Sequence, residues 1–262
     1  DLLPLYAREP EAVTKWRQLL GGVRDIDTFD ATDIRALTFD CYGTLIDWEA
    51  GLLAALRPWV DAHRLTDDDA LRLFARHETV VQQAPPQLPY TQVLPIVFDR
   101  MCDQRGTPRD PALAEALGAS VGRWPAFPDT ADALKRLKSR FQLIVVSNVD
   151  HASFAGTLPR LGVPLDDLVT AQDAGAYKPD PRPLAMALDR LRTRGIVPSQ
   201  VLHVAQSLYH DHVPAKALGL QTAWVDRRAG RPGGATPEAT ITPDLRVTPL
   251  AQLADILCES PR

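Results

Sequence analysis

The chain has 262 residues, of which 45% are hydrophobic and 24% are charged. This composition is typical of a folded globular protein and excludes a disordered or fibrous chain. The formal net charge is -4 at pH 7, so no broad basic field is available to attract nucleic acid or an anionic membrane, and we expect neither as a partner. The three cysteines are an odd number at unrelated spacings, which predicts neither a disulfide framework nor a zinc site.

The compartment is expected to be the cytoplasm. The sequence has no run of about 18 apolar residues that could cross a bilayer. Its first residues lack the basic and then apolar pattern of a secretory leader. A reducing compartment also agrees with the unpaired number of cysteines.

The first 34 residues differ from the rest of the chain. Residues 1–34 contain a short amphipathic stretch, two glycines and a polar run, and we interpret them as an N-terminal extension. An exposed arm of this kind can reach a second copy, so a homodimer is one partner hypothesis. The apolar segment 35–39 then ends at a polar cluster, as a buried strand does where its carboxyl end opens onto a loop.

Residues 48–124 show helical periodicity only, broken by proline-rich joints. The predicted helices span 52–59, 68–81, 91–101 and 111–121. Because no strand signal interrupts them, we predict a helical cap domain at 48–124 that is inserted into the rest of the chain.

The segments on either side of the cap, 35–47 and 125–262, are predicted to form one α/β core domain. Further strand-like apolar runs are found at 141–146, 201–204 and 221–225. Amphipathic segments of helical length separate them, and a glycine-rich and proline-rich loop at 227–237 precedes a last helix at 250–257. Strands that alternate with helices favour a doubly wound parallel sheet with a Rossmann-like arrangement, covered on both faces.

Polar residues follow the predicted strands where each of them ends. Asp40 comes directly after the first strand, and Ser147 and Asn148 follow the second. Lys178 precedes a proline in a later loop, and Asp211 follows the third strand. Since the carboxyl ends of parallel strands meet at one edge, where ligands bind, we expect these side chains to lie together. Helix capping by Ser147 and Asn148, or a plain ion pair of Lys178 with Asp211, would give the same sequence.

The ordered motifs Asp-x-Tyr-Gly-Thr-Leu, Ser-Asn, Lys-Pro-Asp and a final Asp resemble the haloacid dehalogenase superfamily, from about Arg35 to Leu257. Most of that superfamily are magnesium-dependent phosphatases. Two positions depart from the phosphatase pattern: Tyr42 stands where a second aspartate acts as the acid, and Gln206 replaces an aspartate of the fourth motif. A phenol of pKa about 10 is a poor acid at neutral pH, and a neutral amide is a weak ligand for Mg²⁺. We therefore expect no metal and no other cofactor.

The motif containing Tyr42 resembles instead the L-2-haloacid dehalogenase branch, which uses no metal. The resemblance implies that Asp40 attacks the carbon that bears the halogen and forms an ester that water then hydrolyses. It also implies that Lys178 holds Asp40 ionised and that Asp211 orients Lys178 or the hydrolytic water. These three are the predicted catalytic residues.

The same resemblance implies a set of substrate-binding residues. Ser147 and Asn148 match positions that bind the substrate carboxylate, and their hydroxyl and amide groups can donate hydrogen bonds to an anion. Thr44 would donate to Asp40 or support the turn. The predicted substrate-binding residues are Tyr42, Thr44, Arg76, Ser147, Asn148, Gln206, Ser207 and His210.

The chain departs from this branch at the expected halide site. Leu208 replaces an asparagine, and Leu184 replaces a tyrosine six residues beyond the motif lysine. His210 could then donate to the departing halide or activate water. The branch also uses an arginine from the first half of its cap, for which Arg76 is our candidate and Arg72, one turn earlier, its neighbour on the same face. A solvated helix face is the alternative for both arginines.

We therefore predict an enzyme that hydrolyses short 2-haloalkanoic acids to 2-hydroxy acids through an aspartyl ester, with the haloacid and the halide ion as its partners. Two alternatives stay open. A magnesium-dependent phosphatase would hold its metal through Asp40 and Asp211. A non-catalytic relative would bind a partner through the cap or the N-terminal extension.

Overall fold

The computed structural model describes residues 29–84, 87–230 and 239–259. The predicted N-terminal extension therefore lies outside the described residues up to residue 28, and most of the predicted loop at 227–237 lies outside them as well. The end of the predicted extension is not an arm. Phe29 and Ile34 are buried in the main hydrophobic core, because the chain leading into the first strand packs against the core domain.

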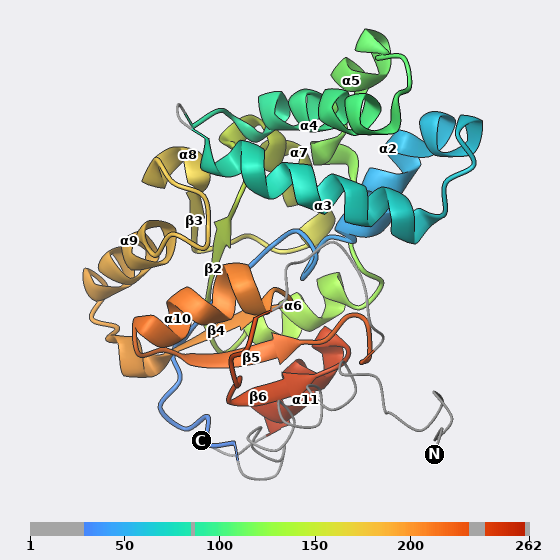
Figure 1. Ribbon diagram of the computed structural model, residues 1–262. Coiled ribbons are helices and arrows are strands. Elements are labelled where there is room, and N and C mark those ends of the chain that lie inside the picture. Colours follow the sequence, from blue (N-terminus) through green and yellow to red (C-terminus); the bar gives the residue numbers. More distant parts are fainter. Residues whose placement is uncertain (1–28, 85–86, 231–238, 260–262) are drawn as a thin grey trace, which may run out of the picture.

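A parallel sheet of six strands forms the centre of the described structure, in the order β3-β2-β1-β4-β5-β6 (Figure 1). The strands are β1 (Ala36–Phe39), β2 (Gln142–Ser147), β3 (Asp167–Thr170), β4 (Val201–Ala205), β5 (Gln221–Val225) and β6 (Leu245–Val247). The predicted doubly wound parallel sheet is confirmed. Four of its strands, β1, β2, β4 and β5, are those that the apolar runs predicted.

The two remaining strands, β3 and β6, were not predicted. β3 has four residues and begins with Asp167, and β6 has three residues with Arg246 at its centre. Both lie at the edges of the sheet. An edge strand has one neighbour and needs no long apolar run to be stable there, so its sequence carries little strand signal.

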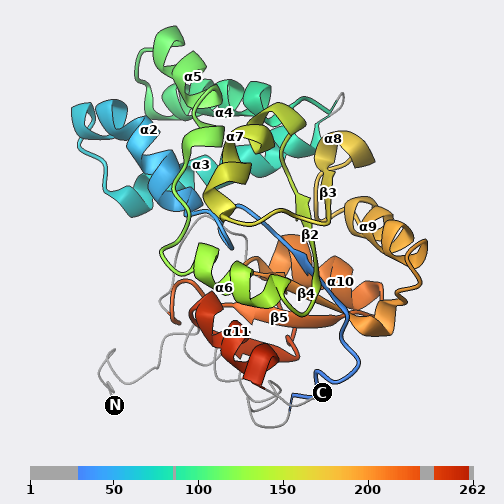
Figure 2. The same cartoon turned by 180° about the vertical axis from the view of Figure 1, so that it is seen from behind.

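Helices cover both faces of the sheet because successive strand residues point to opposite sides. Leu37 packs in the large cluster with α6 (Thr130–Lys138), α7 (His151–Leu161) and α11 (Leu250–Glu259), the side that faces the viewer in Figure 2. Its neighbour Ala36 packs in a second cluster with α9 (Arg182–Arg192) and α10 (Val213–Ala217). None of the helices in the described ranges is long and apolar enough to span a bilayer.

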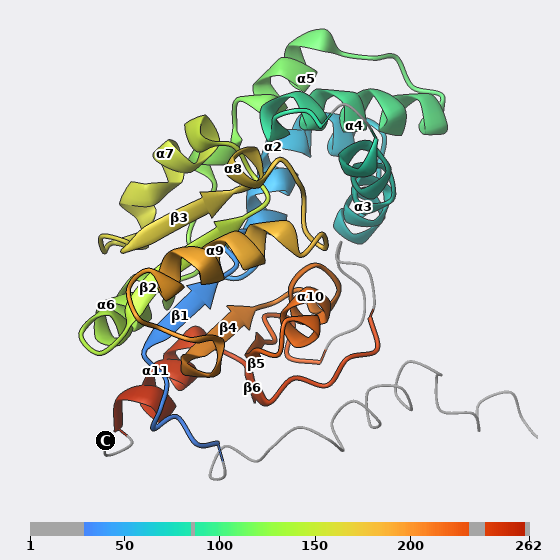
Figure 3. The same ribbon diagram turned by 90° about the vertical axis from the view of Figure 1, so that its left-hand side faces the viewer.

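In the described parts of residues 48–118, four helices form a separate layer. They are α2 (Trp48–Ala62), α3 (Asp67–Gln83), α4 (Tyr90–Arg105) and α5 (Pro111–Gly118). Figure 3 shows this layer beyond the tips of the strand arrows, above the carboxyl edge of the sheet. The Thr66 side chain caps α3 by accepting from Asp69 N–H at 3.1 Å, and the side chains of Leu56, Phe74 and Phe98 form a buried apolar centre.

The site is placed by the point where the strand order reverses. From β1 the chain continues to β2 and β3 on one side of the sheet, and it returns to β4 on the other side of β1. The loops that leave β1 and β4 therefore diverge, and ligands bind in the crevice between such loops. The layer formed by α2 to α5, called the cap below, closes this crevice from above.

Candidate active site

Asp40 is the first residue after β1, at the carboxyl edge of the sheet. Its backbone N–H donates to the carbonyl of Val204 at 3.0 Å and so continues the pairing of β1 with β4. The chain then turns at Gly43, whose φ of 95° lies in the left-handed region that favours glycine. The N–H of Ile46 closes the turn by donating to the carbonyl of Cys41 at 2.9 Å. This tight loop holds Asp40 at the wall of a pocket below the cap.

Two side chains hold the carboxylate of Asp40. Lys178 Nζ donates to Oδ1 at 2.8 Å, and Thr44 Oγ1 donates to Oδ2 at 2.6 Å. The Thr44 hydroxyl in turn accepts from the backbone N–H of Gln206 at 2.9 Å. Burial raises the pKa of Asp40 above the usual aspartate value, and attraction to Lys178 opposes this rise. A carboxylate with so little hydration is a better nucleophile than one in water.

Lys178 is the cation at the centre of the site. Its Nζ donates to Asp40, to Asp211 Oδ1 at 2.6 Å and to the carbonyl of Val146 at 2.9 Å. Asn148 holds the backbone of Lys178 from both sides, because its Nδ2 donates to the lysine carbonyl at 3.1 Å and its Oδ1 accepts from the lysine N–H at 2.7 Å. Burial disfavours the charge of Lys178, but attraction to Asp211 and Asp40 outweighs burial and raises its pKa.

Asp211 lies on a short π-helix, Leu208–His212, directly beyond β4. Its Oδ1 also contacts His203 Nε2 at 3.2 Å, and His203 Nδ1 contacts Thr38 Oγ1 at 2.9 Å. Burial opposes the charge of Asp211, but Lys178 and His203 outweigh it and hold the pKa of this carboxyl well below its usual range. A buried chain of polar contacts therefore runs from inside the sheet to the carboxylate of the site.

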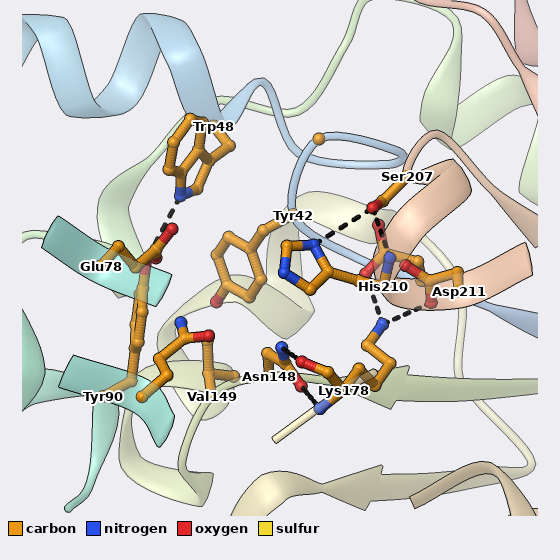
Figure 4. A pocket seen from close by; sticks show the side chains of 13 residues that line it. Tyr42, Trp48, Glu78, Tyr90, Asn148, Val149, Lys178, Ser207, His210 and Asp211 are labelled. Carbon is orange, nitrogen blue, oxygen red and sulfur yellow. Dashed lines mark hydrogen bonds and ion pairs between the residues drawn. The ribbon is translucent and has the colours of Figure 1, made fainter. Parts of the chain in front are cut away.

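Ser207 and His210 form a second polar group on the pocket wall (Figure 4). The Ser207 hydroxyl accepts from the His210 backbone N–H at 2.9 Å and lies 3.1 Å from Nδ1 of the same ring. Burial lowers the pKa of His210 to about 4, so its ring is neutral at pH 7. When the serine hydroxyl donates to Nδ1, the ring proton lies on Nε2 and can be donated to a ligand.

The pocket lies between the sheet edge and the cap. On the core side it is lined by Asp40, Tyr42, Gly43, Asn148, Val149, Lys178, Ser207, His210 and Asp211. On the cap side it is lined by Trp48, Glu78, Gln82 and Tyr90. The edge of the sheet and the helical layer therefore both contribute to one polar pocket.

A carboxyl group faces the site from the cap. The Tyr90 hydroxyl donates to Glu78 Oε1 at 2.5 Å, and the Trp48 indole donates to the Tyr90 hydroxyl at 3.3 Å. Burial raises the pKa of Glu78 to about 7, although the hydrogen bond from Tyr90 lowers it. Glu78 thus changes its charge near neutral pH.

A sequence model of the haloacid dehalogenase-like hydrolases matches residues 34–219, a span that contains Asp40, Lys178 and Asp211. The chain belongs to the haloacid dehalogenase-like hydrolase family. The resemblance derived from the four ordered motifs is therefore confirmed.

Proteins that are similar in sequence to this hydrolase are named for different reactions. This chain is 26% identical over 239 residues to (S)-2-haloacid dehalogenase H-109 of Pseudomonas putida, and the aligned residues cover 86% of this chain and 99% of that protein. It is also 26% identical over 223 residues to the pyrophosphatase PpaX of Bacillus velezensis, covering 85% and 96%. The crystal structure of the L-2-haloacid dehalogenase PA0810 superposes with a TM-score of 0.69 at 26% identity, covering 87% of this chain and all of that one. The names of these relatives therefore do not fix the reaction of this hydrolase.

The structure brings together the three side chains predicted to be catalytic in this hydrolase, and Lys178 contacts both Asp40 and Asp211. The predicted binding residues Tyr42, Asn148, Ser207 and His210 line the same pocket. Their hydrogen bonds give two of them structural roles as well. The Tyr42 hydroxyl hydrogen-bonds Thr157 at 2.7 Å, and the Asn148 amide holds the backbone of Lys178.

Four predicted binding residues do not line the pocket: Thr44, Arg76, Ser147 and Gln206. Thr44 supports Asp40, and the backbone of Gln206 supports Thr44. Ser147 is fully buried, and its hydroxyl has no hydrogen-bond partner in the described part of the chain. Successive side chains of a strand point to opposite sides, and that of Ser147, the last residue of β2, points into the protein. The next side chain, that of Asn148, reaches the site instead.

Arg76, the predicted halide ligand, is exposed and lies outside the pocket. The helix α3 presents Glu78 and Gln82 to the site, which are four residues apart and so share a face. Arg76 precedes Glu78 by two residues, which turns its side chain about 200° around the helix axis. Arg72 is exposed as well and pairs with Asp69 at 2.7 Å. The prediction identified the correct helix and the wrong face.

We expect Arg76→Ala to leave turnover within about twofold of wild type, because the side chain is exposed and lies outside the pocket. Steady-state kinetics of the purified variant test this expectation. A tenfold or larger loss of turnover would contradict this expectation and would mean that Arg76 reaches the substrate when the cap closes.

Sequence reasoning missed three residues that build the site. Glu78 was not singled out, although its spacing from Gln82 marks one face of α3. His203 lies inside β4 and is fully buried, and its ring also contacts Asp211. Arg227 fixes the loop after β1 by donating to the carbonyl of Thr44 through Nε at 3.0 Å and Nη2 at 2.8 Å. Its partner is distant in sequence, so no local pattern indicated this contact.

The raised pKa of Glu78 predicts a pH-dependent stability. A group whose pKa is higher in the folded state stabilises the fold fully below its unfolded value, here 4.5, and loses that contribution as the pH rises through about 7. Glu78→Gln, which keeps the acceptor for Tyr90, should therefore raise the free energy of unfolding at pH 8 by about 1–3 kcal/mol and change it little at pH 4.5. Urea titrations at both pH values measure this. An equal gain at both would show that packing, not charge, is responsible.

Proposed function

We propose that this hydrolase cleaves the carbon–halogen bond of small 2-halo carbonyl compounds through an ester on Asp40, the 2-haloalkanoic acids of its named relatives being the first substrates to test. The observation that carries the proposal is the environment of Asp40. Its carboxylate is buried, held by Lys178 and Thr44, and flanked by Tyr42 where the phosphatase pattern has a second aspartate.

In the first step an Asp40 oxygen attacks the carbon that bears the halogen. A carbon–oxygen bond forms, the carbon–halogen bond breaks, and the halide leaves with the bonding electrons. His210, neutral and on the pocket wall, can donate from Nε2 to the departing halide. Lys178 keeps the attacking carboxylate ionised and oriented until the reaction begins.

In the second step water attacks the carbonyl carbon of the ester. The bond between that carbon and the oxygen that had attacked the substrate breaks, so this former Asp40 oxygen becomes the product hydroxyl. It takes up one proton from the water, the other proton passes to solvent, and Asp40 regains its carboxylate with an oxygen from water. Lys178 remains paired with Asp211 throughout, so the positive charge stays in place while Asp40 is neutral as an ester.

The residues present do not fit a magnesium ion. A magnesium ion held through Asp40 and Asp211, as the phosphatase alternative requires, would compete with Lys178, whose Nζ bridges these two carboxylates at 2.8 and 2.6 Å. Gln206 offers a neutral amide where a carboxylate is expected. No three His, Cys, Asp or Glu side chains in the described ranges are grouped so that they could hold a metal ion.

A single turnover in ¹⁸O-water tests the proposal. With enzyme in excess over chloroacetate, the label should enter the carboxyl group of Asp40, detected in its proteolytic peptide, while the product hydroxyl stays unlabelled. Label that appears first in the product would mean that water attacks the substrate directly. That result would rule out the ester.

A phosphatase is the second candidate, because the pyrophosphatase relative matches this chain as well as the dehalogenase does. The spacing from Ser207 to Asp211 also follows the fourth phosphatase motif. Hydrolysis of p-nitrophenyl phosphate that requires Mg²⁺ and stops with EDTA would favour this candidate. Halide release that is unaffected by EDTA would favour the first one.

A further inference from the structure

The cap wall of the pocket contains a carboxyl group that the proposed chemistry does not use. Figure 4 shows Glu78 beside Trp48 and Tyr90, across the pocket from Lys178 and Asp211. The Tyr90 hydroxyl donates to Oε1 at 2.5 Å and is itself held by the Trp48 indole. Tyr90 thus occupies one oxygen of Glu78, and Oε2 is the acceptor that can face a ligand.

The lysine that supplies positive charge to the pocket is already paired with protein oxygens. Among the described residues that line it, Lys178 is the single lysine or arginine. Its Nζ donates to Asp40, to Asp211 and to the carbonyl of Val146. An ammonium group has three hydrogens, so these contacts leave no donor for a ligand. The two aspartates already exceed Lys178 in charge, and an anion that enters meets no unoccupied cation.

We propose that Glu78 selects substrates whose second polar group is a neutral hydrogen-bond donor, such as a carboxamide, over substrates that carry a carboxylate there. The inference rests on the proposed carbon–halogen hydrolysis and narrows its substrate class to neutral 2-halo amides. An amide N–H can donate to Glu78 Oε2 while Asp40 attacks the neighbouring carbon. A carboxylate on the substrate has no hydrogen to donate, and the negative charges of Glu78 and Asp40 repel it.

The hydrogen bond from Tyr90 supports this assignment because it favours the ionised form of Glu78. Burial opposes that form and raises the pKa of Glu78 to about 7, so the carboxylate predominates at higher pH. The selection should therefore strengthen as the pH rises through neutrality.

A matched pair of substrates tests the inference. Halide release from 2-chloroacetamide and 2-chloroacetate gives the ratio of the two kcat/KM values, in wild type and in Glu78→Gln at about pH 8.5. We expect Glu78→Gln to lower the amide-to-acid ratio about tenfold or more, since one negative charge near the carboxylate is removed. Comparing ratios cancels the different intrinsic reactivity of the two compounds and any uniform loss of active protein.

Arg76→Gln is the control, because Arg76 lies on the same helix, is exposed and lies outside the pocket. It changes the net charge by the same amount in the opposite direction. Its ratio should stay within about twofold of wild type. A rise in the ratio of Arg76→Gln that mirrors the fall in Glu78→Gln would show a general effect of protein charge and would overturn the role of Glu78.

A pH series on the wild type adds a measurement that needs no variant. The amide-to-acid ratio should rise between about pH 6 and 8.5 and should be flat in Glu78→Gln. The other titratable or charged groups facing this space are Asp40, Tyr42, Tyr90, Tyr177, Lys178, His210 and Asp211. Asp40 attacks both substrates, so its titration cancels in the ratio. The pKa of His210 is about 4, that of Asp211 is held below its usual range, and those of the tyrosines and Lys178 are raised, so none of these changes charge in that interval.

The outcomes separate this inference from the proposed function. If both compounds release halide and Glu78→Gln leaves the ratio unchanged, the selection by Glu78 is wrong and the hydrolysis stands. If neither compound releases halide and no ¹⁸O enters Asp40, the proposed function fails and the inference fails with it.

Discussion

Asp40→Asn is expected to abolish halide release, with a fall in kcat of at least about 1,000-fold. The variant keeps the shape of the side chain and an acceptor for Lys178, but a neutral amide cannot displace a halide from carbon. Chloride release from chloroacetate and from chloroacetamide, with a detection limit below a thousandth of the wild-type rate, measures the effect. Intact mass before and after the assay must show that the amide has not hydrolysed back to a carboxylate.

Asp255→Asn makes the same substitution on the exposed face of α11, where Asp255 pairs with Arg136 at 2.6 Å. This control should keep wild-type turnover, because an exposed pair contributes about 1 kcal/mol or less and lies far from the pocket. Halide release at a tenth of the wild-type rate or more in Asp40→Asn would require a different nucleophile, and the ester on Asp40 would have to be abandoned.

Lys178→Met should lower both turnover and stability. Removing the cation leaves Asp40 and Asp211 as two buried carboxylates without the lysine that both contact, which costs about 3–5 kcal/mol in the free energy of unfolding. Turnover should fall by at least about 100-fold, because the carboxylate of Asp40 is no longer held ionised and oriented. Urea titration and halide release on the same preparation measure the two effects.

The loss of stability in Lys178→Met should depend on pH with a definite sign. Without the lysine the pKa values of Asp40 and Asp211 rise in the folded state, and a raised folded pKa means that stability is lost as the pH increases. The variant should therefore be closer to wild type at pH 5 than at pH 8. A deficit that is the same at both pH values would point to lost packing of the side chain instead of unpaired charge.

Lys216→Met is the matched control for this substitution. Lys216 forms an ion pair with Asp244 near the surface, and both side chains are partly exposed. Its removal should cost no more than about 1 kcal/mol and leave turnover unchanged. Equal losses of stability in the two variants would mean that burial of the Lys178 pair has no special role.

The sequence by itself determined the class of fold and the location of the chemistry. β1, β2, β4 and β5 were predictable because strands buried on both faces need continuous apolar runs, which only a few segments of the chain contain. Asp40 and Asp211 were predictable because each follows a predicted strand, and Lys178 was predictable because its Lys-Pro-Asp motif resembles the family. Since parallel strands end at one edge, the fold class alone implied that these side chains meet.

Only the tertiary structure decided which side chains face the substrate. Arg76 and Glu78 lie on one predicted helix, and helical periodicity identifies its apolar face but not which of its polar residues face another domain. Ser147 and Asn148 are neighbours that can both donate a hydrogen bond, and the direction of the last residue of β2 placed only Asn148 in the pocket. These choices depend on how the cap is set against the sheet, and that arrangement is fixed by contacts between residues far apart in sequence, such as Tyr177 Oη donating to the carbonyl of Leu88 at 2.7 Å.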